Sequence, residues 1–175
     1  MNIILAAVIS VNGKITNGSE SNISSWTSQE DKQHFGELIR ANDLIIMGSN
    51  TYEAAREKIV LDGKRLRIVL TQNPEKYTSE SKKGELEFSA ETPDELIHRM
   101  KKAGYTQALL VSGSLVTAAF LKAKLITEVI LTVEPYLFGN GKPLLAEEPF
   151  EMNMELMSME KLNEKGTLLL KYRIT

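Results

Sequence analysis

The sequence contains no cysteine and only two histidines, His34 and His98, among its 175 residues. Without cysteine, the chain has no disulfide, no thiolate nucleophile and no cysteine-ligated metal site. Two histidines are too few for the three-histidine sets that hold catalytic zinc. We therefore expect no metal centre.

The chain also lacks a charge imbalance and a long apolar run. It has 21 basic and 23 acidic residues, without the basic clusters typical of nucleic-acid or anionic-membrane binding. No apolar run approaches the roughly 18 residues of a membrane span, and no signal peptide precedes the first apolar segment. We expect a cytoplasmic protein with a small-molecule partner and with neither nucleic acid nor membrane as partner.

Short apolar runs alternate with helical patterns along the chain. This alternation predicts a mainly parallel sheet covered by helices on both faces, as a single three-layer α/β domain over residues 1–175. The predicted strands are 2–10, 42–48, 66–74 and 127–135, and the segment 107–125 combines a strand, a glycine and a helix. Further helices are predicted at about 28–41, from near Tyr52, and at 92–104.

The last two apolar runs flank the turn signal NEKG, which predicts an antiparallel hairpin at the C-terminal end of the sequence. The methionines at 152, 154, 157 and 159 alternate as in a strand, so we expect them to pack within it. The same Met-rich edge would also suit a homodimer contact, and core packing explains it equally well.

Two acids stand side by side where the helix over about 28–41 begins, in the stretch SSWTSQEDKQHF. Thr27 and Glu30 have the spacing of a capping box, and Ser28 and Asp31 repeat it one residue later. Negative charge there is favoured by the helix dipole by roughly 0.3–1 kcal/mol. Local structure therefore explains one acid and leaves the other open to another role.

Two turns between a strand and a helix combine small residues with free backbone N–H groups. They are Gly48-Ser49-Asn50-Thr51 and Ser112-Gly113-Ser114. Ligands of parallel sheets bind beyond the carboxyl ends of the strands, and a helix N-terminus favours phosphate. Neither turn is a GxGxxG or Walker loop, and strand-to-helix turns need Gly and Ser in any case. Alone, the turns indicate a phosphate site only weakly.

Five segments in order resemble the dihydrofolate reductase superfamily, in particular the reductase domain of the riboflavin-biosynthesis deaminase/reductase, the RibD C-terminal type. They are AAVISVNGKIT, MGSNTYEAA, VSGSLVTAAFL, ITEVILTVEPYLFGNGKPLL and GTLLLKYRIT. The resemblance spans nearly the whole chain. It implies a dihydrofolate reductase-like fold and an NAD(P)H-dependent oxidoreductase.

The resemblance also implies a substrate pocket. Trp26, Asp31 and Phe35 keep the spacing of dihydrofolate reductases, in which this aspartate binds the pterin. Thr132 stands where the family has a threonine that supports the aspartate, and Lys64 replaces the arginine that binds the folate glutamate. We expect Asp31 and Thr132 to be catalytic, with Asp31 orienting the substrate or relaying a proton, and Trp26, Phe35 and Lys64 to bind substrate.

The cofactor residues follow from the resemblance as well. NADPH is expected, with NADH as the alternative, because Ser49 replaces the arginine that commonly pairs the 2′-phosphate. The resemblance assigns Ala7 and Ile15 to the nicotinamide, Gly48, Ser49, Asn50 and Thr51 to the phosphates, Thr71 and Gln72 to the adenine-ribose end, and Gly113, Ser114, Leu115 and Val116 to the pyrophosphate and nicotinamide ribose.

Three functions stay open. The turn SVNGKI and the stretch EPYLFGNGKPLL favour reduction of the ribosylamino-pyrimidine phosphate of riboflavin synthesis. The set formed by Trp26, Asp31, Phe35 and Thr132 favours reduction of dihydrofolate or another dihydropterin. A nucleotide-binding protein without catalysis is the third, since a fold does not fix an activity.

Overall fold

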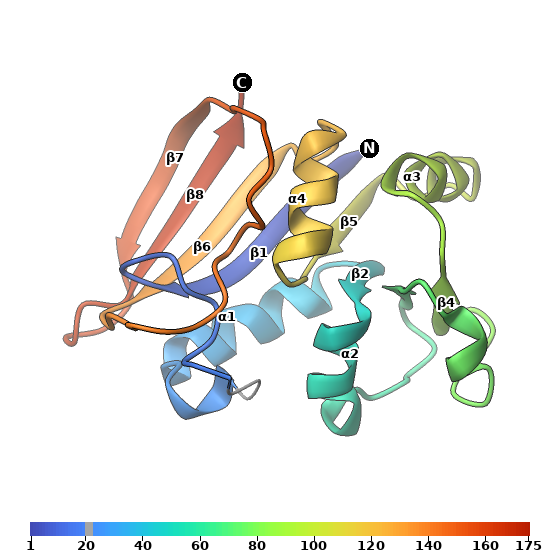
Figure 1. Ribbon diagram of the computed structural model, residues 1–175, viewed down its shortest axis with the longest axis horizontal. Coiled ribbons are helices and arrows are strands. Elements are labelled where there is room, and N and C mark those ends of the chain that lie inside the picture. Colours follow the sequence, from blue (N-terminus) through green and yellow to red (C-terminus); the bar gives the residue numbers. More distant parts are fainter. Residues whose placement is uncertain (20–22) are drawn as a thin grey trace.

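An eight-stranded sheet organises the computed structural model, which describes residues 1–19 and 23–175 (Figure 1). Its strand order is β4-β3-β2-β5-β1-β6-β8-β7. Each neighbouring pair from β4 through β3, β2, β5 and β1 to β6 is parallel. Strand β8 is antiparallel to both β6 and β7. The strands are β1 (Asn2–Ser10), β2 (Leu44–Gly48), β3 (Leu66–Leu70), β4 (Leu86–Ser89), β5 (Gln107–Leu110), β6 (Glu128–Glu134), β7 (Met154–Lys161) and β8 (Leu168–Ile174). The predicted mainly parallel sheet with a C-terminal hairpin is confirmed.

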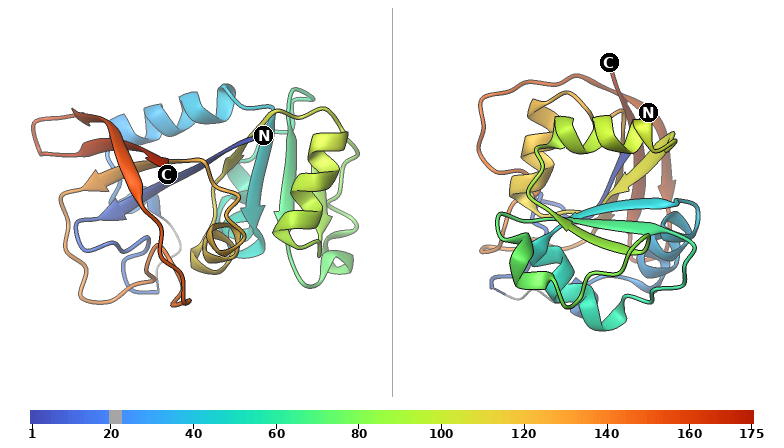
Figure 2. Two further views of the ribbon diagram at one scale, coloured as in Figure 1. Left: turned by 90° about the horizontal axis from the view of Figure 1, so that it is seen from above. Right: turned by 90° about the vertical axis from the view of Figure 1, so that its right-hand side faces the viewer.

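Helices cover both faces of this sheet, which gives three layers (Figure 2). On one face, α3 and α4 contribute Leu96, Met100 and Phe120 to a core cluster. On the other, Leu38 and Ile39 of α1 pack against a second cluster. The helices are α1 (Gln29–Arg40), α2 (Ser49–Ala55), α3 (Pro93–Lys102) and α4 (Ser114–Lys122), with short 3₁₀ helices at Ile23–Ser25, Arg56–Lys58 and Pro74–Tyr77.

The central strands are buried on both faces, which explains their continuous apolar runs. Every residue of β2 and of β3 is buried, including Arg67 on β3. Helix α3 begins as its sequence predicts, with Pro93 at the first position and a capping box between Thr92 and Glu95. Local signals and burial agree in this half of the chain.

The edges of the sheet differ from the sequence prediction. The strand β4 is not predicted from the sequence, because a four-residue edge strand is fixed by pairing with β3 more than by its own pattern. The expectation that the methionines of β7 pack in a core is wrong: Met154, Met157 and Met159 are exposed, because β7 is the edge strand. A homodimer through this exposed edge stays a prediction.

Two long loops lie side by side below the carboxyl ends of β1 and β6. They are joined by backbone hydrogen bonds, among them Ile15 N–H to the Lys142 carbonyl at 2.9 Å and Gly18 N–H to the Asn140 carbonyl at 3.0 Å. Gly141 sits inside this contact with φ +143°, and a Cβ there would lie 2.0 Å from the Thr16 carbonyl oxygen. The loop that positions Ile15 therefore requires glycine at 141.

Gly141→Ala should lower the free energy of unfolding by roughly 1–3 kcal/mol, because alanine both strains this backbone and clashes with Thr16. Gly139→Ala is the matched control, since a Cβ at Gly139 meets nothing within 4 Å. Urea unfolding of both variants measures the difference. Equal stabilities would show that the two loops do not pack as described.

Candidate functional site

A cavity of about 610 Å³ opens between the sheet, α1 and the start of α2. It is lined mainly by apolar side chains, with a few polar groups among them, as is typical of small-molecule sites. Many residues predicted for the site lie on its wall although they are distant in sequence. These are Ala7, Ile15, Asp31, Phe35, Asn50, Thr51, Gly113 and Thr132.

Asp31 is the acidic group at one end of this cavity. Its side chain is 7% exposed, and the Thr132 hydroxyl, from the middle of β6, forms a hydrogen bond with it. Burial, together with the negative charge of Glu134, raises the pKa of Asp31 from 3.8 to about 6, against the opposing effects of the Thr132 hydrogen bond and of Lys32. A carboxyl group with such a pKa holds a proton near neutral pH and is suited to acid catalysis.

The first turn of α1 aims Asp31 into the cavity. The helix begins at Gln29, so Ser28 is the N-cap and its hydroxyl oxygen accepts the Asp31 N–H at 3.2 Å. The predicted capping role of Glu30 is wrong, because its carboxylate instead accepts a hydrogen bond from Asn163 Nδ2 at 3.1 Å. Successive helical residues point about 100° apart, so the two neighbouring acids face different surroundings.

Phe35 and Trp26 have different surroundings. Phe35 lies one turn after Asp31, lines the cavity and is 42% exposed. Trp26 is buried outside the cavity lining, where its ring packs edge-to-face on Phe138 with centroids 5.2 Å apart. In this structure Trp26 therefore fastens the loop after β6 to the start of α1 and does not form the cavity wall.

The two glycine turns lie against each other at the carboxyl edge of the sheet. The Gly48 N–H donates to Ser112 Oγ at 2.9 Å, and a Cβ on Gly48 would meet Ser112 Oγ at 3.0 Å and Val116 Cγ2 at 3.1 Å. A Cβ on Gly113 would instead meet nothing within 4 Å. Gly48 thus serves close packing, while Gly113 leaves open space at the N-terminus of α4.

The remaining predicted cofactor residues lie outside the cavity lining. The Ser114 hydroxyl donates to the Pro143 carbonyl, Leu115 is 75% exposed, and Val116 packs beneath Gly48. Ser49 begins α2, while Thr71 and Gln72 follow β3, whose last residue pairs with Gly48. These residues gather along one edge of the sheet, because the carboxyl ends of parallel strands meet there.

Lys64, predicted to bind substrate, is exposed and does not line the cavity; Arg65 and Arg67 do. The reason is the alternation of side chains at β3, which turns residues 65, 67 and 69 to the side opposite 64 and 66. The sequence predicts a strand over 66–74 and does not by itself show that Arg67 is buried within it. Only the burial of the strand shows where this charge lies.

Arg67 is 5% exposed, and its guanidinium makes no hydrogen bond to any residue in the described part of the chain. Arg65 beside it pairs with Asp62 at 3.1 Å. Burial and the neighbouring charge of Arg65 lower the pKa of Arg67, against the opposing charges of Asp62 and Glu85, and an arginine stays protonated at neutral pH. A buried cation without an acceptor is costly, which favours an anionic ligand at this wall.

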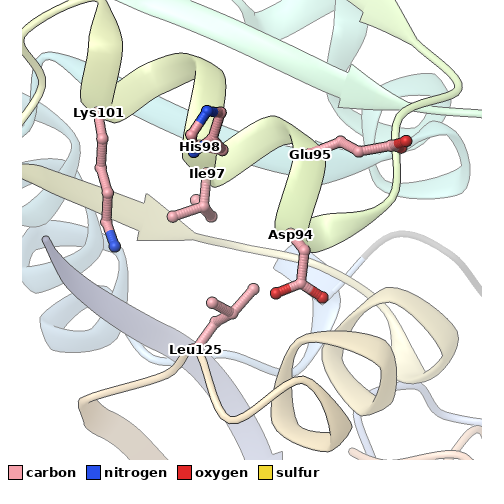
Figure 3. A pocket seen from close by; sticks show the side chains of 6 residues that line it. All are labelled: Asp94, Glu95, Ile97, His98, Lys101 and Leu125. Carbon is pink, nitrogen blue, oxygen red and sulfur yellow. The ribbon is translucent and has the colours of Figure 1, made fainter.

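A second, shallower hollow lies beside α3 (Figure 3). Asp94 and Lys101 extend on the side that faces Leu125, whereas Glu95 points away and caps the helix with Thr92. Leu125 precedes β6, so this hollow lies at the amino ends of the strands. It is therefore at the opposite edge from the expected ligand site.

Within residues 1–19 and 23–175, no group of three or more acidic or histidine side chains is placed to hold a metal ion. In the same described residues, no helix has the length and apolar character needed to cross a bilayer.

Comparison with known proteins agrees with this architecture. Residues 1–168 match the RibD C-terminal domain family. A protein of Bacillus subtilis (strain 168) described as uncharacterized protein YwjB is 25% identical over 94% of this chain and 89% of its own length. Among solved structures, a putative riboflavin biosynthesis protein from Shewanella sp. PV-4 superposes with a TM-score of 0.79 at 21% identity, covering 100% and 99% of the two chains. RibD from Acinetobacter baumannii gives 0.76 at 18% identity, covering 99% of this chain and 58% of that one.

Asp31→Asn should stabilise the folded protein at pH 8 by up to about 3 kcal/mol, because a tenfold change in proton affinity is worth about 1.4 kcal/mol and the pKa rises from 3.8 to about 6. The stability that protonated Asp31 provides is present below pH 4 and is lost as pH rises through 6. The gain should therefore vanish below pH 4. Chemical denaturation at pH 3.5, 6 and 8 measures it, and a destabilised variant at pH 8 would show that Asp31 is ionised without penalty.

Proposed function

Because the chain belongs to the RibD C-terminal domain family, we propose that it is an NADPH-dependent reductase acting on a ribosylamino-pyrimidine phosphate of riboflavin biosynthesis. The observation that carries the proposal is the buried acid Asp31, hydrogen-bonded to Thr132 at one end of a large cavity. Hydride transfer to an imine carbon leaves an electron pair on its nitrogen, and that nitrogen must gain a proton. Protonated Asp31 is the proton donor.

Thr132 and the apolar wall define how Asp31 acts. The Thr132 hydroxyl holds the carboxyl group in place, and both side chains are buried. Phe35, Leu38 and Ile39 form an apolar wall along α1 that keeps water from the reacting atoms. The protein thus orients the ring, supplies one proton and excludes solvent.

The residues at the carboxyl edge of the sheet fit a dinucleotide. The open space above Gly113 leaves room for a ligand to approach the N-terminus of α4, and Asn50 and Thr51 present polar groups beside it. Ala7 and Ile15 provide small and apolar surface on the same cavity wall. NADPH supplies the hydride when bound. We propose that these residues hold it, and that Ser49 makes its preference over NADH modest.

Arg67 supports a phosphorylated substrate. It lies on β3, four residues before Thr71, which follows the strand; this separation is roughly 13 Å in extended chain, so Arg67 is remote from the proposed adenine-ribose end. It lines the same cavity as Asp31. A ligand that places a nitrogen-containing ring at Asp31 and an anion at Arg67 satisfies both groups, and the planar guanidinium suits a phosphate.

Dihydrofolate or another dihydropterin is the second candidate substrate. Phe35 lies on the cavity wall one turn from Asp31, as a flat ring next to a pterin would require. An anionic glutamate tail would also suit Arg67. A nucleotide-binding protein without catalysis is the remaining alternative, which fold likeness alone does not remove.

NADPH oxidation at 340 nm with each candidate substrate tests the proposal. We expect turnover with the ribosylamino-pyrimidine phosphate, and Asp31→Asn should lower the rate by roughly 10²-fold, the effect of removing a positioned acid. Glu30→Gln is the matched control, because Glu30 points away to Asn163. Turnover with dihydrofolate alone would select the second candidate, and cofactor binding without turnover on either substrate would select the third.

Arg67→Met should raise KM for a phosphorylated substrate by roughly 10 to 100-fold with a smaller effect on kcat, since a hydrogen bond to a charged group is worth roughly 1.5–3 kcal/mol. Lys64→Met should leave KM unchanged because Lys64 is outside the cavity. The opposite pattern, with KM sensitive only to Lys64, would place the anion where the sequence first suggested.

A further inference from the structure

Glu134 is a second buried carboxylate next to Asp31, and it is outside the cavity lining. It is the last residue of β6 and is 2% exposed. One carboxylate oxygen accepts the Ser28 N–H at 2.7 Å, and the other accepts the Thr167 hydroxyl at 2.7 Å. In the described part of the chain no lysine, arginine or histidine forms an ion pair with it. Buried carboxylates without a cation are uncommon, so this one has a specific cause.

The bonds of Glu134 close a ring around the acid. Glu134 holds the backbone of Ser28, and the Ser28 hydroxyl oxygen accepts the Asp31 N–H at 3.2 Å. Asp31 in turn is hydrogen-bonded to Thr132. Thr132 and Glu134 are two residues apart on one strand and so point to the same face of the sheet. Thr132 and Glu134 of β6 thereby fix Asp31 and Ser28 at the start of α1.

The C-terminal hairpin completes this arrangement. Thr167, which precedes β8, is 1% exposed, and Asn163 in the β7–β8 turn holds it through two hydrogen bonds of 3.0 and 3.2 Å. The same Asn163 side chain donates to Glu30 at 3.1 Å. Three separate segments, β6, the hairpin turn and the start of α1, therefore meet at the Glu134 carboxylate.

We propose that Glu134 is a positioning residue for the reduction: it anchors the first turn of α1 to the end of β6 so that the Asp31 carboxyl group lies in the cavity. This inference rests on the proposed function for its catalytic meaning, whereas the anchoring itself does not. Asp31 and Glu134 differ in what they contact: Asp31 lines the cavity, whereas both oxygens of the Glu134 carboxyl group accept hydrogen bonds from the protein.

The charge of Glu134 acts on Asp31 directly. The charged groups that influence Asp31 are Glu134 on β6, which raises its pKa, and Lys32 on its own helix, which lowers it. The Thr132 hydroxyl and the Ser28 N-cap are neutral hydrogen-bond partners of Asp31. Removing the charge of Glu134 should therefore lower the pH at which Asp31 loses its proton.

Glu134→Gln tests the proposal, because an amide keeps the size and can still accept the Ser28 N–H while losing the charge. We expect the titration midpoint of the Asp31 carboxyl carbon, followed by ¹³C NMR and assigned with Asp31→Asn, to fall by roughly one pH unit. The alkaline limb of the kcat profile should move by the same amount. Glu30→Gln, which removes an exposed acid from the same helical turn, should move neither.

Glu134→Ala removes the anchor as well as the charge. Amide hydrogen exchange at Ser28 and Asp31 should accelerate by at least about tenfold, since the Ser28 N–H loses its acceptor. Exchange at Ser28 and Asp31 that stays unchanged in Glu134→Ala, or that accelerates equally in Glu30→Gln, would overturn the proposal. Hydrogen exchange and the NMR titration need no substrate, so they test the role of Glu134 even if every candidate substrate fails. If Glu134→Ala does not fold, an Asp31 midpoint that stays unchanged in Glu134→Gln would overturn the proposal, because the anchoring requires the two carboxyl groups to lie close together.

Discussion

The site depends on burying one carboxyl group, Asp31, between the first turn of α1 and the strand β6. That burial leaves the group 7% exposed and raises its pKa to about 6. Burying an ionisable group costs free energy, so its surroundings must hold it in place. Here the Thr132 hydroxyl bonds the Asp31 side chain, and the Ser28 hydroxyl accepts the Asp31 backbone N–H. The geometry of the helix start, of β6 and of the hairpin that supports them follows from this requirement.

Two buried groups of opposite charge line the cavity. Asp31 is buried at one end, and Arg67, at 5% exposure and without a hydrogen bond to any described residue, lines the same cavity from β3. No ion pair joins the two in the described part of the chain. The cavity wall therefore presents both an acid and a cation.

Stability and chemistry are opposed in this arrangement. An ionised Asp31 destabilises the folded state above pH 6, and the unpaired Arg67 adds a further desolvation cost. The apolar sheet compensates, because β2 and β3 are buried along their whole length beneath helices on both sides. A continuous core of this kind tolerates two strained polar positions at one wall.

The sequence by itself determined the alternating strands and helices, the capping of α3, the glycine turns at Gly48 and Gly113, and the resemblance that directed attention to Asp31. These features depend on local periodicity and on short motifs, which act within a few residues. Only the tertiary structure decided that Glu30 bonds to Asn163 and does not cap the helix, that Arg67 and not Lys64 lines the cavity, and that Glu134 anchors the helix start. Each of these depends on burial and on hydrogen bonds between residues far apart in the chain: Ser28 and Glu134 meet only because β6 pairs beside β1 and the hairpin closes over its end. The sequence also did not predict that β7 is exposed or that β4 is a strand. Both are edge strands, and the position of a strand in the sheet depends on which strands pair, not on the strand's own residues.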